Sequence, residues 1–205
     1  MATTDEKNKA TEREDRITVI ASHVQAILET IDEHDREGLE KTPERVARYY
    51  VDELYCSGNA LEEELNTVFV EETTAREMIT VMNIPFSSMC EHHLLPYFGR
   101  VHIAYIPHKG VVGLSKLARL AQAAGRGFSI QERVTDRIAD ALNNKLSPAG
   151  VIVVIDCVHT CMIVRGVHAI GSRTVTSALR GVFRDSEAAR TEFYAVLNGS
   201  KNCGL

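Results

Sequence analysis

Two short clusters of cysteine and histidine have the types and spacing of metal ligands. Cys90 and His93 place a thiol and an imidazole three positions apart, and Cys157, His159 and Cys161 follow in a second, valine-rich stretch. Alternate residues of a strand share a face, so a strand here directs the three side chains of the second cluster the same way. If the two clusters meet, a zinc ion can bind Cys90, His93 and Cys161 and keep a fourth position for water, as catalytic zinc sites do.

Spacing alone leaves other roles for these residues open. Cys157 competes as a ligand, and with it the site becomes a closed structural site with four protein ligands. Zinc-dependent nucleobase deaminases are disfavoured, because their His-x-Glu and Pro-Cys-x-x-Cys motifs are absent. His92 and His159 are left as acid–base groups beside the metal, since an imidazole with a pKa of about 6.5 exchanges protons near neutral pH.

Basic residues beyond the first cluster predict an anionic ligand. Ser115 is expected to cap a helix whose first N–H groups attract anions, and Lys116 and Arg119 lie three positions apart on one side of that helix. Residues 161–184 contain no acidic side chain. Several cations near a metal ion favour a polyphosphate over a single carboxylate. The arginines within residues 161–184 are Arg165, Arg173, Arg180 and Arg184.

Glu132 has two interpretations. Ser129 and Glu132 fit the Ser-x-x-Glu capping box, in which the carboxylate bonds back to the serine backbone at the start of a helix. Alternatively, Gln131 and Glu132 face the site. A carboxylate there can accept hydrogen bonds from the N1–H and 2-amino groups that guanine presents together. Local sequence favours capping and leaves the second interpretation open.

The elements that position these residues change character along the chain. Apolar residues recur at helical spacing from Ile17 to about His34, and Thr42 is expected to cap a second helix that ends near residues 57–59. Runs of Val and Ile then predict strands, with helices between and after them. The expected strands are 67–72, 79–86, 99–106, 151–164 and 173–182, and the expected later helices are 115–124, 129–146 and 186–197. Two N-terminal helices, then the order ββααββ with its helix pair and a final helix, predict an α+β fold with an antiparallel sheet.

Composition divides the 205 residues into unlike parts. The net charge of −5 combines an acidic front, −11 over residues 1–77, with a basic back, +6 over residues 78–205. We therefore expect three segments: a charged flexible arm at 1–16, a helical segment at 17–66 and a catalytic domain at 67–205. No run approaches the roughly 20 apolar residues of a membrane span, and the charged N-terminus is not a signal peptide, so a cytoplasmic location is expected. The five cysteines then favour metal or thiol chemistry over disulfides.

Over roughly residues 38–197 the sequence resembles the GTP cyclohydrolase I family. The resemblance is carried by specific motifs in the expected order. Before Gln131 the family usually has an Arg-Arg pair and a proline-like start to the helix, whereas this chain has Ala-Gly-Arg-Gly-Phe-Ser at 124–129. The matching motifs are Thr42-Pro43-Glu44-Arg45, Ser88 to Pro96, Gly113 to Arg119, Gln131-Glu132-Arg133, His159-Thr160-Cys161 and Arg165-Gly166-Val167.

The resemblance implies a zinc-dependent hydrolase that converts GTP and water to 7,8-dihydroneopterin triphosphate and formate. It also implies the tunnelling fold, in which antiparallel sheets of several subunits join into a barrel, and a homodecamer with active sites at subunit interfaces. Residue by residue, it gives zinc ligands at Cys90, His93 and Cys161; proton-transfer groups at His92 and His159; guanine contacts at Gln131 and Glu132; ribose and triphosphate contacts at Ser115, Lys116, Arg119 and Arg165; and a phosphate contact from a neighbouring subunit at Arg45.

Three other functions compete with this one. An enzyme of the same fold with another purine or pterin substrate is countered by the Gln131-Glu132 pair and the cations near Ser115. A non-catalytic scaffold stabilised by zinc predicts Cys157 as the fourth ligand. A nucleic-acid binder would use the basic back half, but that half lacks interleaved aromatic and basic residues. The expected partner is therefore GTP, with neither nucleic acid nor a membrane.

Overall fold

The computed structural model describes residues 4–31, 36–55, 60–69 and 76–200. The chain forms two compact units, residues 1–55 and residues 56–205. Within the described parts, none of the helices combines the length and apolar character that a membrane crossing requires. The predicted end of the second helix, at 57–59, and the end of the first predicted strand, at 70–72, lie outside the described residues.

The N-terminal unit is helical. It contains α1 (Thr4–Thr30), the 3-10 turn η1 (Glu37–Leu39), α2 (Thr42–Arg48) and the π-helical turn η2 (Tyr49–Leu54). Residues 4–16, where we expected a flexible arm, form the first half of α1. The predicted cap at Thr42 is wrong, because Lys41 occupies the N-cap position and Thr42 is already helical. Ile17, Ala47 and Val51 bury the apolar stripe that joins α1 to the second helical segment.

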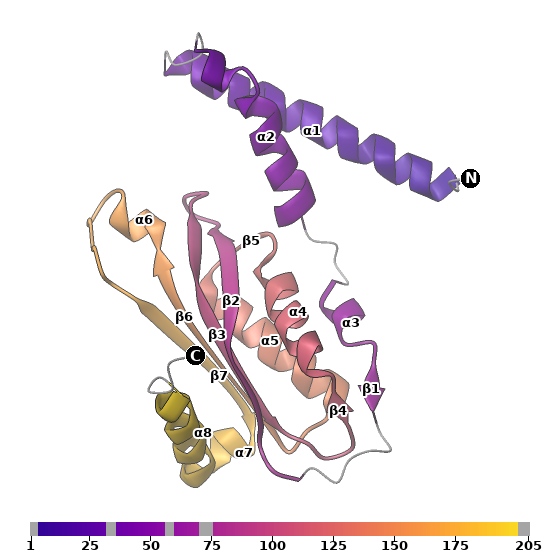
Figure 1. Ribbon diagram of the computed structural model, residues 1–205, viewed down its shortest axis with the longest axis vertical. Coiled ribbons are helices and arrows are strands. Elements are labelled where there is room, and N and C mark those ends of the chain that lie inside the picture. Colours follow the sequence, from indigo (N-terminus) through magenta and orange to yellow (C-terminus); the bar gives the residue numbers. More distant parts are fainter. Residues whose placement is uncertain (1–3, 32–35, 56–59, 70–75, 201–205) are drawn as a thin grey trace. The chain divides into compact units, whose positions relative to one another are not determined.

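The second unit is built on a five-stranded sheet in the order β5-β2-β3-β6-β7 (Figure 1). Neighbouring strands are antiparallel except for the short parallel pair of β2 and β5. Mixed α+β structure is thus confirmed. The strands are β1 (Val68–Phe69), β2 (Ile79–Cys90), β3 (Pro96–Ile106), β4 (Val111–Val112), β5 (Phe128–Ser129), β6 (Gly150–His159) and β7 (Thr174–Gly181), of which β1 and β4 form a separate pair.

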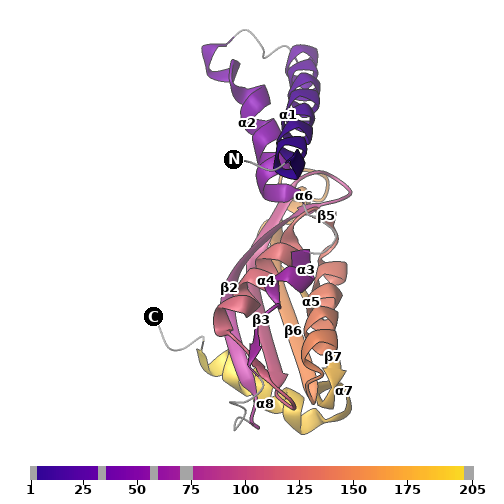
Figure 2. The ribbon, with the colours of Figure 1, turned by 90° about the vertical axis from the view of Figure 1, so that its right-hand side faces the viewer.

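Helices cover both faces of this sheet (Figures 1 and 2). Strand residues alternate between the faces: Ile103 and Tyr105 pack in the cluster that contains α4 and α5, whereas Ala104 packs with Phe183 and Phe193 of α7 and α8. This period of two is what a strand buried on both sides requires. The helices are α3 (Ala60–Glu64), α4 (Leu114–Gly125), α5 (Gln131–Leu146), α6 (Thr160–Ile163), α7 (Val182–Asp185) and α8 (Glu187–Ser200).

Several chain segments meet at one end of the sheet. Strands β2 and β3 are joined by a tight connection, so Met89 pairs with Pro96. Strand β6 runs beside β3 until Tyr97 pairs with His159. The predicted strand at 151–164 is therefore too long, because β6 ends at His159 and α6 begins at Thr160. This sheet end gathers the last residue of β2, the first residues of β3, the whole of α6 and the short strand β5.

Candidate active site

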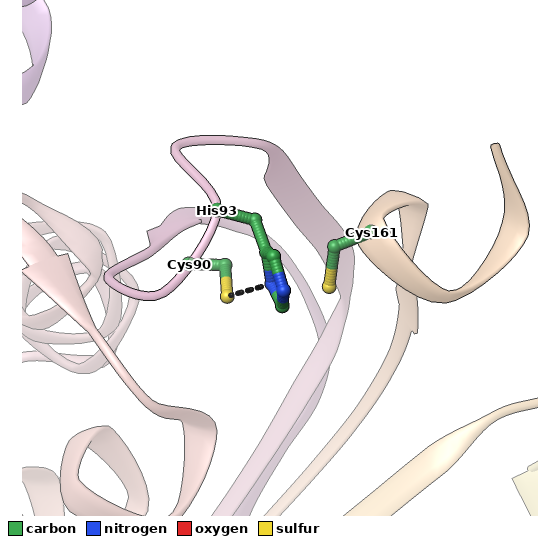
Figure 3. A group of neighbouring side chains, drawn as sticks. All are labelled: Cys90, His93 and Cys161. Carbon is green, nitrogen blue, oxygen red and sulfur yellow. Dashed lines mark hydrogen bonds between the residues drawn. The ribbon is translucent and has the colours of Figure 1, made fainter. Parts of the chain in front are cut away.

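Cys90, His93 and Cys161 form one group at this end of the sheet (Figure 3). Their ligand atoms all lie within 4.8 Å of one another, and the Cys90 Sγ is 3.6 Å from the His93 Nδ1. Cys90 ends β2, His93 lies in the connection to β3, and Cys161 is the second residue of α6. The two sequence clusters therefore meet, which was the condition for the predicted zinc site.

Local hydrogen bonds hold the two ligand segments in place. The Cys90 N–H donates to the Leu95 carbonyl and the Leu94 N–H to the Cys90 carbonyl, which closes the connection on itself with Leu94 at a left-handed φ of 52°. On the other side, the Thr160 hydroxyl donates to the Pro96 carbonyl at 2.6 Å. This bond ties the start of α6 to the start of β3, so the turn with Cys161 is anchored beside the turn with His93.

The donor set of this group fits a zinc-like cation. Two thiols and one imidazole are ligands that zinc prefers, and three protein ligands leave an open position. The cysteines are only 6% and 8% exposed, whereas His93 is exposed. Burial, and then the neighbouring Cys90, raise the pKa of the Cys161 thiol. When two buried sulfur atoms lie within 4.8 Å of each other, ionisation of both thiols is unfavourable unless a cation lies between them. A divalent metal can supply that charge.

Cys157 lies apart from this group. It is completely buried in the sheet, and burial raises the pKa of its thiol to about 12. The expectation that Cys157, His159 and Cys161 share one strand face is wrong, because the strand ends before Cys161. Among the residues that the structure describes, Cys90, His93 and Cys161 form the metal-ligand group, and Cys157 does not belong to it.

His159 is held from two directions. Its ring stacks on Tyr97 with centroids 4.5 Å apart and planes 3° from parallel, and its Nε2 lies 2.8 Å from the Gln131 Oε1. Burial lowers the pKa of His159, with the charge of Glu132 opposing this effect. Tyr97 was not among the predicted site residues. Tyr97 lies beside His159 because the two residues pair in the β3–β6 register, and no local sequence pattern predicts that register.

His92 is exposed and lies beside an ion pair. Its ring is 6.1 Å from that of His93, and its Nε2 is 3.9 Å from a Glu91 carboxylate oxygen. The same carboxylate accepts two hydrogen bonds from Arg133, at 2.6 and 3.3 Å, which hold the pKa of Glu91 below its ordinary value. This clamp, also missed from sequence, joins the metal-binding connection to α5.

The start of α5 differs from the capping-box expectation. Ile130 is the N-cap residue, and the Ser129 hydroxyl donates to the Ile130 carbonyl. Ser129 lies in β5, so Glu132 is not a reciprocal cap and its side chain is exposed. Gln131, in contrast, is only 1% exposed.

The predicted ribose- and phosphate-binding residues of α4 differ in exposure, since Ser115 and Arg119 are exposed and Lys116 is half-buried. Ser115 is exposed but is not the cap, since Gly113 holds that position. Lys116 Nζ is 3.9 Å from a Glu64 carboxylate oxygen of α3. Arg119 and Arg126 help to line a hollow of about 160 Å³ between α3 and α4.

The later arginines do not act together. Arg173 makes two hydrogen bonds to Asp156, and Arg180 bonds to Asp136 and Asp140. Their charges are thus compensated by acids from outside the acid-free stretch, so counting them toward an anion site was wrong.

Two other predicted cations keep exposed side chains. Arg165 is exposed, and its charge lowers the pKa of the Cys161 thiol, in opposition to burial. Arg45 is exposed in the N-terminal unit.

The unusual glycines at 124–129 have structural causes. A Cβ on Gly125 would lie 2.4 Å from the Ser87 carbonyl oxygen and 2.8 Å from the Phe86 ring, so the end of α4 packs directly on β2. Gly127 has φ +85°, which a side chain would strain. The glycines therefore fix this connection to β5 and α5.

Comparisons with known proteins show the family of this chain. The model of the family described as GTP cyclohydrolase I matches residues 20–198. The GTP cyclohydrolase 1 of Carboxydothermus hydrogenoformans is 51% identical over 176 residues, 85% of this chain and 91% of that protein. The GTP cyclohydrolase 1 of Pelotomaculum thermopropionicum is 48% identical over 182 residues, 88% of this chain and 96% of that protein. Among solved structures, the apo archaeosine synthase QueF-Like aligns with a TM-score of 0.40 and 17% identity, covering 51% of this chain and 93% of that one.

Proposed function

The chain belongs to the GTP cyclohydrolase I family and converts GTP to dihydroneopterin triphosphate, and we propose that it does so with a zinc ion held by Cys90, His93 and Cys161. This reaction is the first step of pterin and folate biosynthesis. The observation that carries the zinc proposal is the meeting of two sulfurs and one imidazole nitrogen within 4.8 Å. When bound by three protein ligands, zinc supplies a water molecule whose pKa is lowered to about 7.

The two remaining imidazoles transfer protons while the guanine ring opens. His159 is predominantly neutral near pH 7, because burial lowers its pKa, so it can accept a proton first and return it to a ring nitrogen later. His92, exposed with its ring 6.1 Å from that of His93, is the second proton-transfer group. Together they move the protons of two hydrolyses: water adds to C8 and the C8–N9 bond breaks, and a second water then breaks the N7–C8 bond and releases C8 as formate.

Substrate recognition is assigned to charged side chains around this centre. The exposed carboxylate of Glu132 accepts from the N1–H and 2-amino groups of guanine, with Gln131 beside it. The ribose and triphosphate are bound by Ser115, Lys116, Arg119 and Arg165, and Arg45 contributes from a neighbouring subunit.

A homodecamer of the tunnelling fold, with active sites at subunit interfaces, is part of the proposal. Strand β7 is an edge strand, and within the described residues it pairs only with β6. An unpaired edge offers backbone groups to another chain. Val175 on this strand and Val167 and Ile170 in the preceding loop are exposed apolar side chains that a neighbouring subunit can cover. A cytoplasmic location remains a prediction from the sequence.

The function is tested by incubating reduced, zinc-loaded protein with GTP, oxidising the product and measuring pterin fluorescence and released formate. We expect both signals from the unmodified protein. Cys161→Ser should lose bound zinc and both signals, whereas Cys157→Ala should keep stoichiometric zinc. Zinc loss in Cys157→Ala would instead favour the four-ligand scaffold.

Two other outcomes distinguish the alternatives. Formate without a pterin would mean that the ring opens but the ribose rearrangement fails, so the final product differs. Neither signal, with zinc bound, would favour another purine or pterin substrate.

A further inference from the structure

The side chain of Gln131 is fixed in one orientation by its hydrogen-bond partners. Its Nε2 lies 3.0 Å from each of three acceptors, the carbonyl oxygens of Ile155 and Thr174 and the hydroxyl oxygen of Thr176. A backbone carbonyl oxygen only accepts hydrogen bonds. The group that faces the two carbonyls must therefore be the NH2 end of the amide, and the amide oxygen must face away from them.

The hydroxyl groups around Gln131 agree with this orientation. The Thr135 hydroxyl donates to the Gln131 backbone carbonyl at 2.7 Å. Its one hydrogen is then used, so in the 2.6 Å contact between the two threonine hydroxyls Thr176 must be the donor. The Thr176 oxygen keeps a lone pair that accepts from the Gln131 NH2 group. The two hydrogens of the NH2 group are shared among three acceptors, and none of these three contacts requires the amide to accept.

This orientation determines which nitrogen of His159 carries a hydrogen. The Gln131 Oε1, 2.8 Å from the His159 Nε2, can only accept, so Nε2 must carry the N–H. A neutral imidazole has one N–H, and its other nitrogen is an acceptor. The stacked Tyr97 ring prevents the imidazole from tilting out of this plane. Nδ1 is therefore the nitrogen of the neutral ring that accepts a proton.

We propose that Gln131 is a positioning residue that holds His159 as the Nε2–H tautomer and presents its Nδ1 to the substrate. The inference rests on the proposed role of His159 in proton transfer. It gives the buried amide a task that differs from the guanine contact implied by the family resemblance. The reading of guanine then falls to the exposed Glu132 alone.

The test combines a spectroscopic and a kinetic measurement on the full-length, zinc-loaded protein. Magic-angle-spinning NMR of protein labelled with ¹⁵N-histidine, at about pH 8 where a free imidazole is neutral, reports the tautomer of His159. Its signal is assigned by its loss in His159→Asn. The variant is Gln131→Met, which keeps the volume but neither accepts strongly nor donates. The matched control is Thr176→Val, which removes one of the three acceptors and leaves both carbonyls to orient the amide.

We expect a single Nε2–H tautomer in the unmodified protein and in Thr176→Val, and a loss of that single tautomer in Gln131→Met. The kcat of Gln131→Met should fall about 10- to 100-fold, a part of what acid–base catalysis supplies, with KM for GTP within about threefold. An Nδ1–H tautomer in the unmodified protein overturns the inference, even where the variant does not fold. A higher KM at unchanged kcat also overturns it, because Gln131 would then bind substrate.

Failure of the proposed function is recognised separately. If His159→Asn retains normal turnover, the proton-transfer role of His159 is wrong whatever its tautomer. The NMR signal of the unmodified protein still decides whether Gln131 orients the ring.

Discussion

The close packing of Gly125 on β2 makes its replacement by alanine a sharp test of the fold near the site. The added Cβ would lie 2.4 Å from the Ser87 carbonyl oxygen and 2.8 Å from the Phe86 Cε2, whereas ordinary contacts begin near 3.4 Å. The end of α4 and β2 must therefore separate by about 1 Å. Ser87 is a backbone neighbour within the strand that ends at Cys90, so the strain is directed toward a metal ligand.

Two opposing effects set the magnitude of this change. Overpacking of a well-packed core costs about 1–3 kcal/mol. Alanine in place of glycine recovers up to about 1 kcal/mol within a helix and less at its last residue, which is where Gly125 stands. The net loss of stability is about 1–2 kcal/mol, which lowers the Tm of a chain of this size by roughly 2–8 °C. Zinc affinity should fall as well.

Thermal unfolding at one fixed protein concentration measures the effect, and chelator competition measures zinc affinity. The matched control is Gly199→Ala in α8, where an added Cβ meets nothing within 4 Å. It should leave the Tm unchanged or slightly higher. If Gly125→Ala unfolds at or above the temperature of the unmodified protein, helix propensity has outweighed the contact and the close-packing argument is refuted.

Three further predictions address other charged or buried groups. Arg133→Met removes the clamp on Glu91 and should weaken zinc binding about 10- to 100-fold by chelator competition; unchanged affinity would show that the clamp does not orient the ligands. Cys157 should resist alkylation in the folded protein, because burial raises its pKa to about 12, and peptide mass spectrometry would expose a contrary result. Hydrogen bonds from Arg13 lower the pKa of Asp52. The stability that these hydrogen bonds add is fully present above pH 3.8, the pKa of the unfolded carboxyl, and is lost as the pH falls through the lower pKa of folded Asp52. Arg13→Met should therefore raise the pKa of Asp52, and an unchanged pKa in an NMR titration would contradict the ion pair.

The Cys90, His93 and Cys161 group was the most predictable part of the molecule. Its three residues lie within two short motifs, and their types are those that zinc prefers. Two of the strands were equally predictable, since the runs at 79–86 and 99–106 lie within β2 and β3. These features depend on residues that are close in sequence, so local sequence patterns predict them.

Features that depend on distant residues were not predictable. The Val- and Ile-rich run at 151–164 favours a strand throughout, and it stops at His159 where the next hydroxyl bonds to Pro96 of another strand. The arginines after Cys161 looked available, because Asp156, Asp136 and Asp140 precede them by many positions. Both errors arise from partners that only the tertiary fold supplies.

In the N-terminal helix, distant partners order residues for which the sequence predicted no structure. Its charged first half suggested an arm, yet Arg13 bonds to Asp52 and the Arg16 guanidinium lies 4.4 Å from the centre of the Tyr55 ring. Composition indicated solvation correctly, since most of these side chains are exposed. It held no information about the helical turns that follow in the same unit.

The position of the ligands on either side of the β3–β6 pair has a consequence for biosynthesis. Cys90 and His93 are made before β3, and Cys161 is made only after α4, α5 and β6. A nascent chain therefore carries two ligands until the strand pair from Tyr97–His159 to Ile106–Gly150 can close. Such long-range pairing is a slow event in folding. If Cys90, His93 and Cys161 hold the proposed ion, all three can bind it only after this pairing, and the bound ion then stabilises the closed form.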